Sequence, residues 1–171
     1  MSLAEELLEH AWFLANLDPH STSQANIRRA ISAAYYAVFH LLAAEVAAQV
    51  SPHVPAGLRE RTQRALDHKQ MLKVAKAFSQ AGAKRAKDLP DDIVLPDPVS
   101  QELASISIGF RELQEARHAA DYDVLKQLDP ADAPTMVRRA EKVFQDWKAE
   151  RSSNNMPVFL AAMIFGKDWN R

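Results

Sequence analysis

The sequence predicts an all-α protein: an up-and-down antiparallel bundle of about five helices. Its 171 residues include only four glycines, and 47% of them are apolar. In every long segment the apolar residues recur at spacings of three and four, which is typical of helices packed on one side. Segments of alternating polarity, the mark of half-buried strands, are few, and prolines lie between the periodic segments. A chain of this length suits one domain with a proper core.

The central helix is predicted from the stretch 27–50, IRRAISAAYYAVFHLLAAEVAAQV, which is apolar on almost every side. A helix of this kind belongs in the middle of a bundle. Its first half nevertheless carries polar residues on two adjoining faces, Arg28, Ser32 and Tyr35 on one and Arg29, Tyr36 and His40 on the other. Polar groups on a core helix need partners, so these residues either satisfy neighbouring helices and loops or line a cleft.

The other helices are predicted from their start signals. Ser2 with Glu5 forms an S-x-x-E capping box for a first helix that ends near Leu17. Four more helices are predicted: a short one near 58–66, one capped by Asp67, one that begins at Asp97-Pro98, and one that begins at Asp129-Pro130 or Asp132.

An apolar seam runs along the helix predicted after Asp97. Its members have alternating spacings of four and three: Val99, Leu103, Ile106, Phe110 and Leu113. The next seam position is Arg117. Because an unpaired buried charge is very costly, Arg117 is expected to meet a carboxylate or helix C-terminal carbonyls, or to open onto a polar cleft.

The chain divides at residue 152 into a predicted bundle, 1–152, and an apolar extension, 153–171. The extension, which contains MPVFLAAMIF, is too apolar to stay free in water and is expected to dock on the bundle or on a partner subunit. Together with the seam, it exceeds what one small bundle needs. The sequence therefore predicts a homodimer.

Several classes of protein are disfavoured by what the sequence lacks. There is no cysteine, so no disulfide, thiolate metal site or cysteine nucleophile exists, which fits a reducing cytoplasm. No signal sequence and no spanning segment of roughly 20 apolar residues are recognised, so no membrane association is expected. Phosphate-binding glycine loops, nucleophile elbows and H-E-x-x-H are absent. Glu-x-x-His does not occur on two helices, as a bundle-core metal site would require, so neither a metal nor another cofactor is expected.

Charge is strongly segregated along the middle of the chain. Residues 58–87 carry nine Lys or Arg against two acids, a net charge of +7, whereas residues 88–123 carry nine acids against two Arg, a net charge of −7. Lys69, Lys73 and Lys76 share the outer face of one predicted helix and are candidates for binding a nucleic-acid backbone. The alternative is a solvated face neutralised by the acidic segment that follows.

The run 116–123, ARHAADYD, is the densest group of chemically capable side chains. On a helix, Arg117 and Asp121 are neighbours four residues apart, and so are His118 and Tyr122. One interpretation is a purely structural cluster of Arg117, Asp121 and Tyr122 that joins this helix to the central one. The other is a functional site, because an Arg on an apolar seam lies beside a His and could face the polar groups of the central helix.

Three stretches in this order resemble the HEPN domain superfamily: the central RRAISAAYYAVFH, the segment DHKQMLKVAKAF, and the closing R-x-x-A-D-Y of ARHAADYD. The resemblance covers about residues 3–150. It implies a helical bundle that dimerises and, in many prokaryotic members, a metal-independent ribonuclease or the toxin of a toxin–antitoxin pair.

Active members of that superfamily carry Arg, a polar residue, three more residues and then His. Arg117 and His118 match the first two positions, but Tyr122 stands where the final His belongs. Tyrosine is a much weaker general base than histidine at neutral pH, although its hydroxyl can still hold a phosphate beside an Arg clamp.

The resemblance therefore implies a protein that binds RNA or a nucleotide, or a ribonuclease or toxin with an antitoxin partner. The candidate catalytic residues are Arg117, His118 and Tyr122, supported by Asp121, Arg28, Ser32 and Tyr35. The rival hypothesis is a non-catalytic dimerisation or protein-interaction module.

Overall fold

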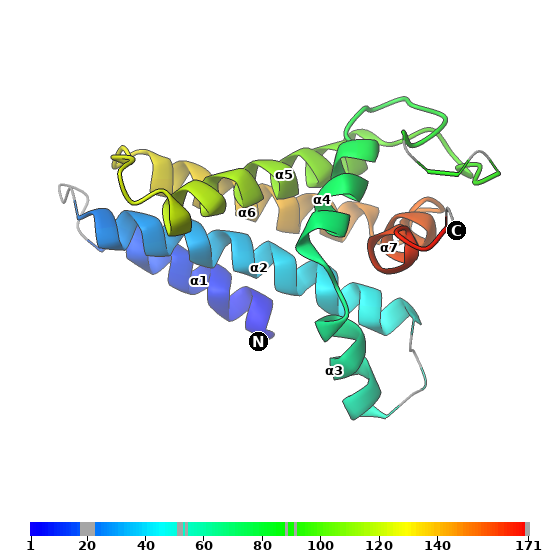
Figure 1. Cartoon of the computed structure of the whole chain (residues 1–171), viewed down its shortest axis with the longest axis horizontal. Coiled ribbons are helices and arrows are strands. Elements are labelled where there is room, and N and C mark those ends of the chain that lie inside the picture. Colours follow the sequence, from blue (N-terminus) through cyan, green and yellow to red (C-terminus); the bar gives the residue numbers. More distant parts are fainter. Residues whose placement is uncertain (18–22, 51–52, 54, 88, 91, 170–171) are drawn as a thin grey trace. The chain divides into compact units, whose positions relative to one another are not determined.

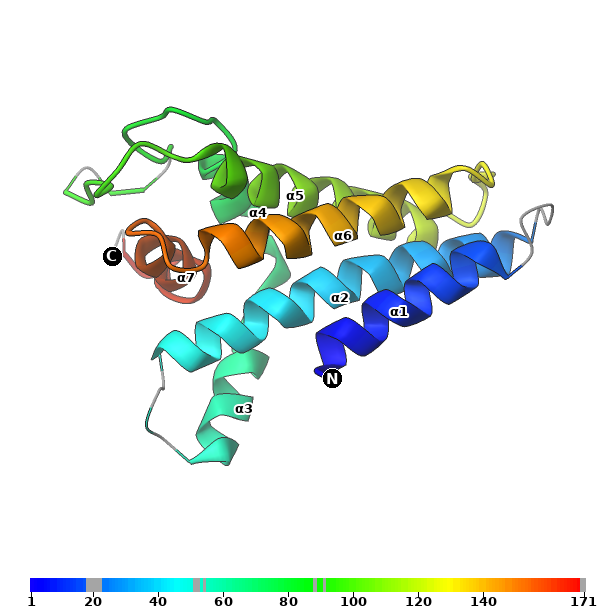
Figure 2. The ribbon, with the colours of Figure 1, turned by 180° about the vertical axis from the view of Figure 1, so that it is seen from behind.

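The protein is all-helical in a computed structural model that describes residues 1–17, 23–50, 53, 55–87, 89–90 and 92–169. These residues form seven helices and no strand (Figures 1 and 2): α1 (Leu3–Asn16), α2 (Gln24–Val50), α3 (Ala56–Arg64), α4 (His68–Ala77), α5 (Gln101–Tyr122), α6 (Asp132–Glu150) and α7 (Met156–Phe165). The all-α fold class predicted from the sequence is confirmed. The expected number was about five; the seven include the two short helices predicted in the basic segment and one formed by the C-terminal extension.

Side-chain caps fix several of the helix starts. Ser2 and Glu5 form the predicted capping box, and the Asp67 carboxylate accepts hydrogen bonds from the backbone N–H groups of Lys69 and Gln70. The predicted start at Asp97-Pro98 is wrong. Helix α5 begins at Gln101, and the Ser100 hydroxyl accepts a hydrogen bond from the Leu103 N–H, 3.0 Å away.

The segment before α5 is not helical, because its backbone groups bond elsewhere. Val99 exchanges two backbone hydrogen bonds with the chain that follows α4: Gly82 N–H donates to Val99 O at 2.7 Å, and Val99 N–H donates to Ala83 O at 2.8 Å. Gly82 adopts a φ of 79°, which glycine reaches without strain. The Asn155 amide bonds both the N–H and the carbonyl of Asp97, so Asp97 joins this segment to the start of α7.

The chain forms two compact units, of which the first comprises Met1–Leu41 and Gly109–Gln145. It contains α1, the first part of α2, the end of α5 and the start of α6. Helices α1 and α2 run antiparallel side by side, as do α5 and α6 (Figures 1 and 2). Helices α5 and α6 approach closely at Gly109, where a Cβ atom would lie 2.5 Å from Cγ2 of Val143.

The second unit comprises Leu42–Ile108 and Asp146–Arg171, with α3, α4, α7 and the remaining parts of α2, α5 and α6. Helices α4 and α7 pack together through Phe78 and Phe159, whose ring centroids are 5.2 Å apart in an edge-to-face arrangement. The Gln70 amide donates to the Ala162 carbonyl at 3.0 Å. Residue 152, at which the sequence analysis separates bundle from extension, lies inside this unit.

The two features from which the sequence predicted a homodimer are used inside the chain. Val99, Leu103, Ile106, Phe110 and Leu113 are all buried. In α7, Met156, Phe159, Leu160, Ala162 and Met163 are buried as well. The homodimer stays a prediction, but the seam and the extension no longer support it.

Helix α2 is the one described helix that is long and apolar enough to cross a membrane, over Gln24–Gln49. This finding corrects the expectation that no segment reaches that length. Core helices of soluble proteins meet the same criterion, and 61% of the most apolar stretch of α2 is buried inside the protein.

Candidate functional site

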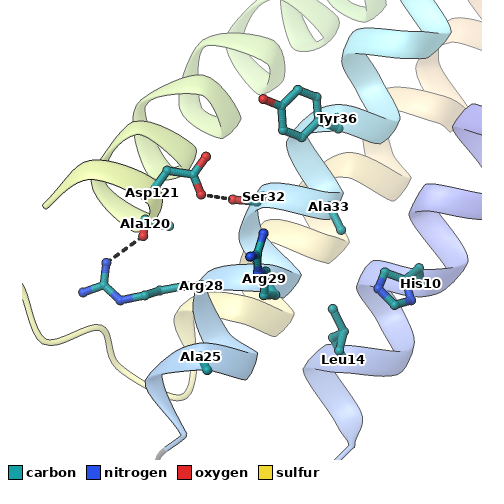
Figure 3. Close-up of a pocket in the computed structure, with 10 residues that line it drawn as sticks. All are labelled: His10, Leu14, Ala25, Arg28, Arg29, Ser32, Ala33, Tyr36, Ala120 and Asp121. Carbon is teal, nitrogen blue, oxygen red and sulfur yellow. Dashed lines mark hydrogen bonds between the residues drawn. The ribbon is translucent and has the colours of Figure 1, made fainter. Parts of the chain in front are cut away.

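Arg117 is the centre of a polar cluster built between α2 and α5. Its Nε lies 2.7 Å from Oδ2 of Asp121, one helical turn away, and its Nη2 donates to the Tyr36 hydroxyl at 2.8 Å. The other oxygen of Asp121 accepts a hydrogen bond from the Ser32 hydroxyl (Figure 3). The expectation that a half-buried Arg117 would meet a carboxylate is confirmed.

Three tyrosine rings surround the guanidinium of Arg117. Its Cζ lies 5.0 Å from the ring centroid of Tyr122, 5.4 Å from that of Tyr36 and 5.8 Å from that of Tyr35. These distances are within the range of cation–π attraction. The side chain of Arg117 is only 19% exposed. The cluster therefore holds the guanidinium in one position by charge, hydrogen bonding and ring contacts together.

The surroundings keep this cluster in a defined protonation state. Burial opposes the charged form of Arg117, but Tyr36, Asp121 and Tyr122 outweigh burial and raise its pKa. Burial also raises the pKa of Tyr35, which is completely buried, and Arg117 opposes that rise only in part. The guanidinium is thus charged and the Tyr35 phenol is neutral at any physiological pH.

His118 and Tyr122 lie on the solvent side of the cluster. Both residues are exposed, and Tyr122 is 61% exposed. Their ring centroids are 5.2 Å apart, as expected for residues four apart on one helix. Tyr122 thus covers the guanidinium of Arg117 with one face while its side chain stays open to solvent.

Arg28, predicted as a supporting residue of the site, caps the C-terminal end of α5. Its Nη1 donates to Ala120 O at 2.6 Å and Asp123 O at 3.1 Å, with a weaker contact to Ala119 O at 3.4 Å. Its Nη2 donates to Asp123 O at 3.0 Å and Lys126 O at 2.6 Å. A cation at the negative end of a helix dipole satisfies carbonyls that have no partner within the helix.

A pocket of about 780 Å³ lies beside the cluster, among α1, α2 and α5 (Figure 3). We call it the α1–α2 pocket; its lining residues are His10, Leu14, Ala25, Arg28, Arg29, Ser32, Ala33, Tyr36, Ala120 and Asp121. Ser32, Tyr36 and Asp121 therefore belong both to the Arg117 cluster and to the pocket wall. Arg117, His118 and Tyr122 do not line it.

The sequence did not point to His10. Arg29 lies on one of the two polar faces of α2 that were expected either to meet neighbours or to line a cleft, although it was not among the predicted site residues. His10 is on α1, a helix that carried no candidate, and no motif connects it with α2. Arg29 and Tyr36 share one face of α2, and that periodicity was the available signal for them. Both His10 and Arg29 are exposed, and neither makes a hydrogen bond or ion pair with another described residue.

Lys69, Lys73 and Lys76 are exposed along α4, in the second unit. The opposite side of the same helix is buried through Met71, Val74 and Ala75. The predicted basic outer face therefore exists.

No group of three His, Asp or Glu side chains in the described part of the chain is placed to hold a metal ion. Comparison of the chain with protein-family models, curated proteins and solved structures found no match. Conclusions about function therefore depend on the residues themselves.

Proposed function

We propose that the protein is a HEPN-like protein that binds RNA or a nucleotide at the first unit. The observation that carries the proposal is the joining of the Arg117 cluster to the α1–α2 pocket through Ser32, Tyr36 and Asp121. The cluster contains the R-x-x-A-D-Y residues on which the resemblance depends. The pocket adds arginine side chains, which suit phosphate groups.

Binding is better supported than cleavage by the position of Arg117. Its charge is already compensated by Asp121, and Tyr122 covers it. An arginine that stabilises charge developing on a phosphate must direct its N–H groups at that phosphate. Cleavage by this cluster would therefore require the Arg117–Asp121 pair to open when RNA binds.

A more specific form of the proposal is that the protein is a metal-independent ribonuclease that acts as a toxin and has an antitoxin partner. The exposure of His118 beside Tyr122 favours it, because His118 can reach solvent and substrate as a general base. If this is correct, the wild-type protein cleaves RNA in EDTA and Arg117→Ala does not. Restoring the family's residue with Tyr122→His is expected to raise the rate by roughly 10²-fold, the usual worth of a positioned base.

The experiment measures binding and cleavage with the same protein preparations. Labelled RNA is titrated with wild type, Arg117→Ala and Tyr122→His, and the products are followed by gel electrophoresis with EDTA and with added metal. Arg117→Ala, purified identically, also controls for contaminating nuclease. If RNA stays intact with both wild type and Tyr122→His, in EDTA and with added metal, the nuclease hypothesis is refuted and only the binding hypothesis remains. RNA that binds neither variant nor wild type would end both.

A protein-interaction module is the second candidate, and the surface of α1 favours it. Helix α1 and its C-cap residue Leu17 expose four large apolar side chains, each more than half exposed: Leu3, Trp12, Phe13 and Leu17. Phe13 and Leu17 are four residues apart and share one face. Dimerisation or binding of an antitoxin would cover it.

Light scattering tests this candidate with a matched pair of substitutions. Phe13→Glu places a charge on the exposed apolar surface of α1, whereas Leu125→Glu places one at a side chain after α5 that is 88% exposed. If α1 forms an interface, wild type and Leu125→Glu are dimers at micromolar concentration and Phe13→Glu is a monomer. A monomeric wild type would contradict the homodimer.

A further inference from the structure

We propose that the α1–α2 pocket is a site for a phosphate monoester, held by Arg29 and His10 and by the Tyr36 hydroxyl. This inference rests on the proposed function and narrows it from RNA or nucleotide in general to the terminal phosphate of such a ligand. The proposed donors lie outside the R-x-x-A-D-Y motif. Ala120 and Asp121 of that motif line the same pocket, whereas Arg117, His118 and Tyr122 do not.

The charges in the pocket favour an anion. Asp121 is its one acidic lining residue, and both of its carboxylate oxygens are engaged, one by Ser32 and the other by Arg117. Arg28 is held by backbone carbonyls but keeps its positive charge. Among the lining residues, Arg28 and Arg29 against Asp121 give a net charge of +1, and Arg117 beside the pocket already pairs with Asp121. An anionic ligand is therefore attracted without displacing an existing ion pair.

Three groups in the lining have hydrogen-bonding capacity that no described residue uses. Arg29 and His10 make no hydrogen bond or ion pair within the described residues. The Tyr36 hydroxyl accepts a hydrogen bond from Arg117, so its own proton remains available for donation. Figure 3 shows His10 projecting from α1 and Arg29 and Tyr36 from α2, with the Tyr36 hydroxyl directed towards α5.

The number of donors distinguishes a monoester from a diester. A phosphate monoester presents three terminal oxygens and close to two negative charges at neutral pH, whereas an internal phosphodiester presents two such oxygens and one charge. Three donor groups of separate origin, one of them a guanidinium with several N–H donors, can serve three oxygens. Leu14, Ala25 and Ala33 supply an apolar wall, and the volume of about 780 Å³ lies within the range for small-ligand sites, large enough for an attached nucleoside.

Two sources share this chemistry: the phosphorylated end of an RNA and a free nucleoside monophosphate. Fluorescence anisotropy with one labelled oligoribonucleotide, prepared with a 5′-phosphate and with a 5′-hydroxyl, measures the preference for the RNA end. Calorimetry with adenosine monophosphate, with adenosine as its control, measures the free nucleotide. Wild type is expected to prefer the phosphorylated partner of at least one of these pairs by about tenfold to a hundredfold, the usual worth of hydrogen bonds to a charged group.

Arg29→Ala is the decisive variant because Arg29 is exposed and without a partner among the described residues, so the fold should tolerate its loss. It is expected to reduce the preference for the phosphorylated ligand to within about twofold. His10→Gln is expected to reduce this preference in part. Arg138→Ala is the matched control: it removes the same charge from an exposed position of the same unit, outside the pocket, and should keep the wild-type preference.

The possible results separate this inference from the function on which it rests. The phosphate site is overturned if wild type binds both members of each pair with equal affinity, or if Arg29→Ala and Arg138→Ala show the same preference for the phosphorylated ligand. If RNA still binds in either case, the proposed function stands. Binding of adenosine monophosphate that depends on Arg29, without binding of RNA, supports the site and removes RNA from the proposed function. Absence of binding to every probe overturns both.

Discussion

Replacing Arg28 with alanine should strongly destabilise the first unit, whereas the same change at Arg29 should not. The guanidinium of Arg28 donates to the carbonyls of Ala119, Ala120, Asp123 and Lys126, at distances from 2.6 to 3.4 Å. Arg29, one residue along the same helix, has no partner among the described residues. The two substitutions remove the same side chain and the same charge, so their difference isolates the effect of capping α5.

The magnitude follows from which carbonyls water can replace. Those of Asp123 and Lys126 are bonded at the exposed end of the guanidinium, where water can take over, whereas the bonds to Ala119 and Ala120 are partly buried. A hydrogen bond to a charged group contributes about 1.5–3 kcal/mol. Interaction with the helix dipole adds about 0.3–1 kcal/mol. Arg28→Ala should therefore lower the free energy of unfolding by about 2–4 kcal/mol, and Arg29→Ala by less than about 0.5 kcal/mol.

Thermal unfolding followed by circular dichroism measures the effect. For a chain of this size, 1 kcal/mol corresponds to roughly 2–4 °C in Tm, so Arg28→Ala should lower Tm by roughly 5–15 °C while Arg29→Ala leaves it nearly unchanged. If the two units unfold in separate transitions, only the transition of the first unit should move. Equal Tm values for the two variants would refute the assignment of Arg28 as the cap of α5.

Three further predictions follow from the charged residues. Asp67→Ala should lower the free energy of unfolding by about 1 kcal/mol at pH 7. Backbone hydrogen bonds from Gln70 and Lys69 lower the pKa of Asp67, so the stability advantage of wild type over this variant should disappear as pH falls below about 4. Urea unfolding at several pH values can check this. Burial lowers the pKa of His40, so the native state resists its protonation. Relative to His40→Gln, wild type should lose stability as pH falls from about 6.5 towards 5. Parallel profiles of unfolding free energy against pH for the two proteins would contradict this. Replacing Lys69, Lys73 and Lys76 together by Gln should weaken RNA binding and flatten the slope of log affinity against log salt, whereas an unchanged slope would leave that face solvated.

The fold could be predicted well because it depends on local signals. The capping box of Ser2 and the cap by Asp67 were predicted from spacings of three residues and are present. The start of α5 was missed because its cause is not local. Asp97-Pro98 has the composition of a helix start, but Val99 accepts a backbone hydrogen bond from Gly82 and donates one to Ala83, and the helix begins only after this pairing. Pairings between distant segments leave no periodic trace in the sequence.

The candidate site could be predicted only where its residues share a helix. The Arg117–Asp121 pair was predicted from a spacing of four on α5 and is present. Arg28 was predicted as a neighbour of that cluster, but its partners are backbone carbonyls, which no side-chain pattern can indicate. His10 could not be found because the packing of α1 on α2, rather than any motif, brings it to the pocket.

The different roles of Arg28 and Arg29 follow from helix geometry. Successive residues of an α-helix are separated by about 100° around its axis, so two adjacent arginines on α2 face different neighbours. Arg28 meets the carbonyl end of α5, where its charge serves stability, and Arg29 faces the pocket beside α1, where its charge has no protein partner among the described residues. Like Arg28, Arg117 already has protein partners, because its guanidinium pairs with Asp121 and donates to the Tyr36 hydroxyl. Of these three arginines, Arg29 is the one that can bind a phosphate without first giving up a contact that the fold uses.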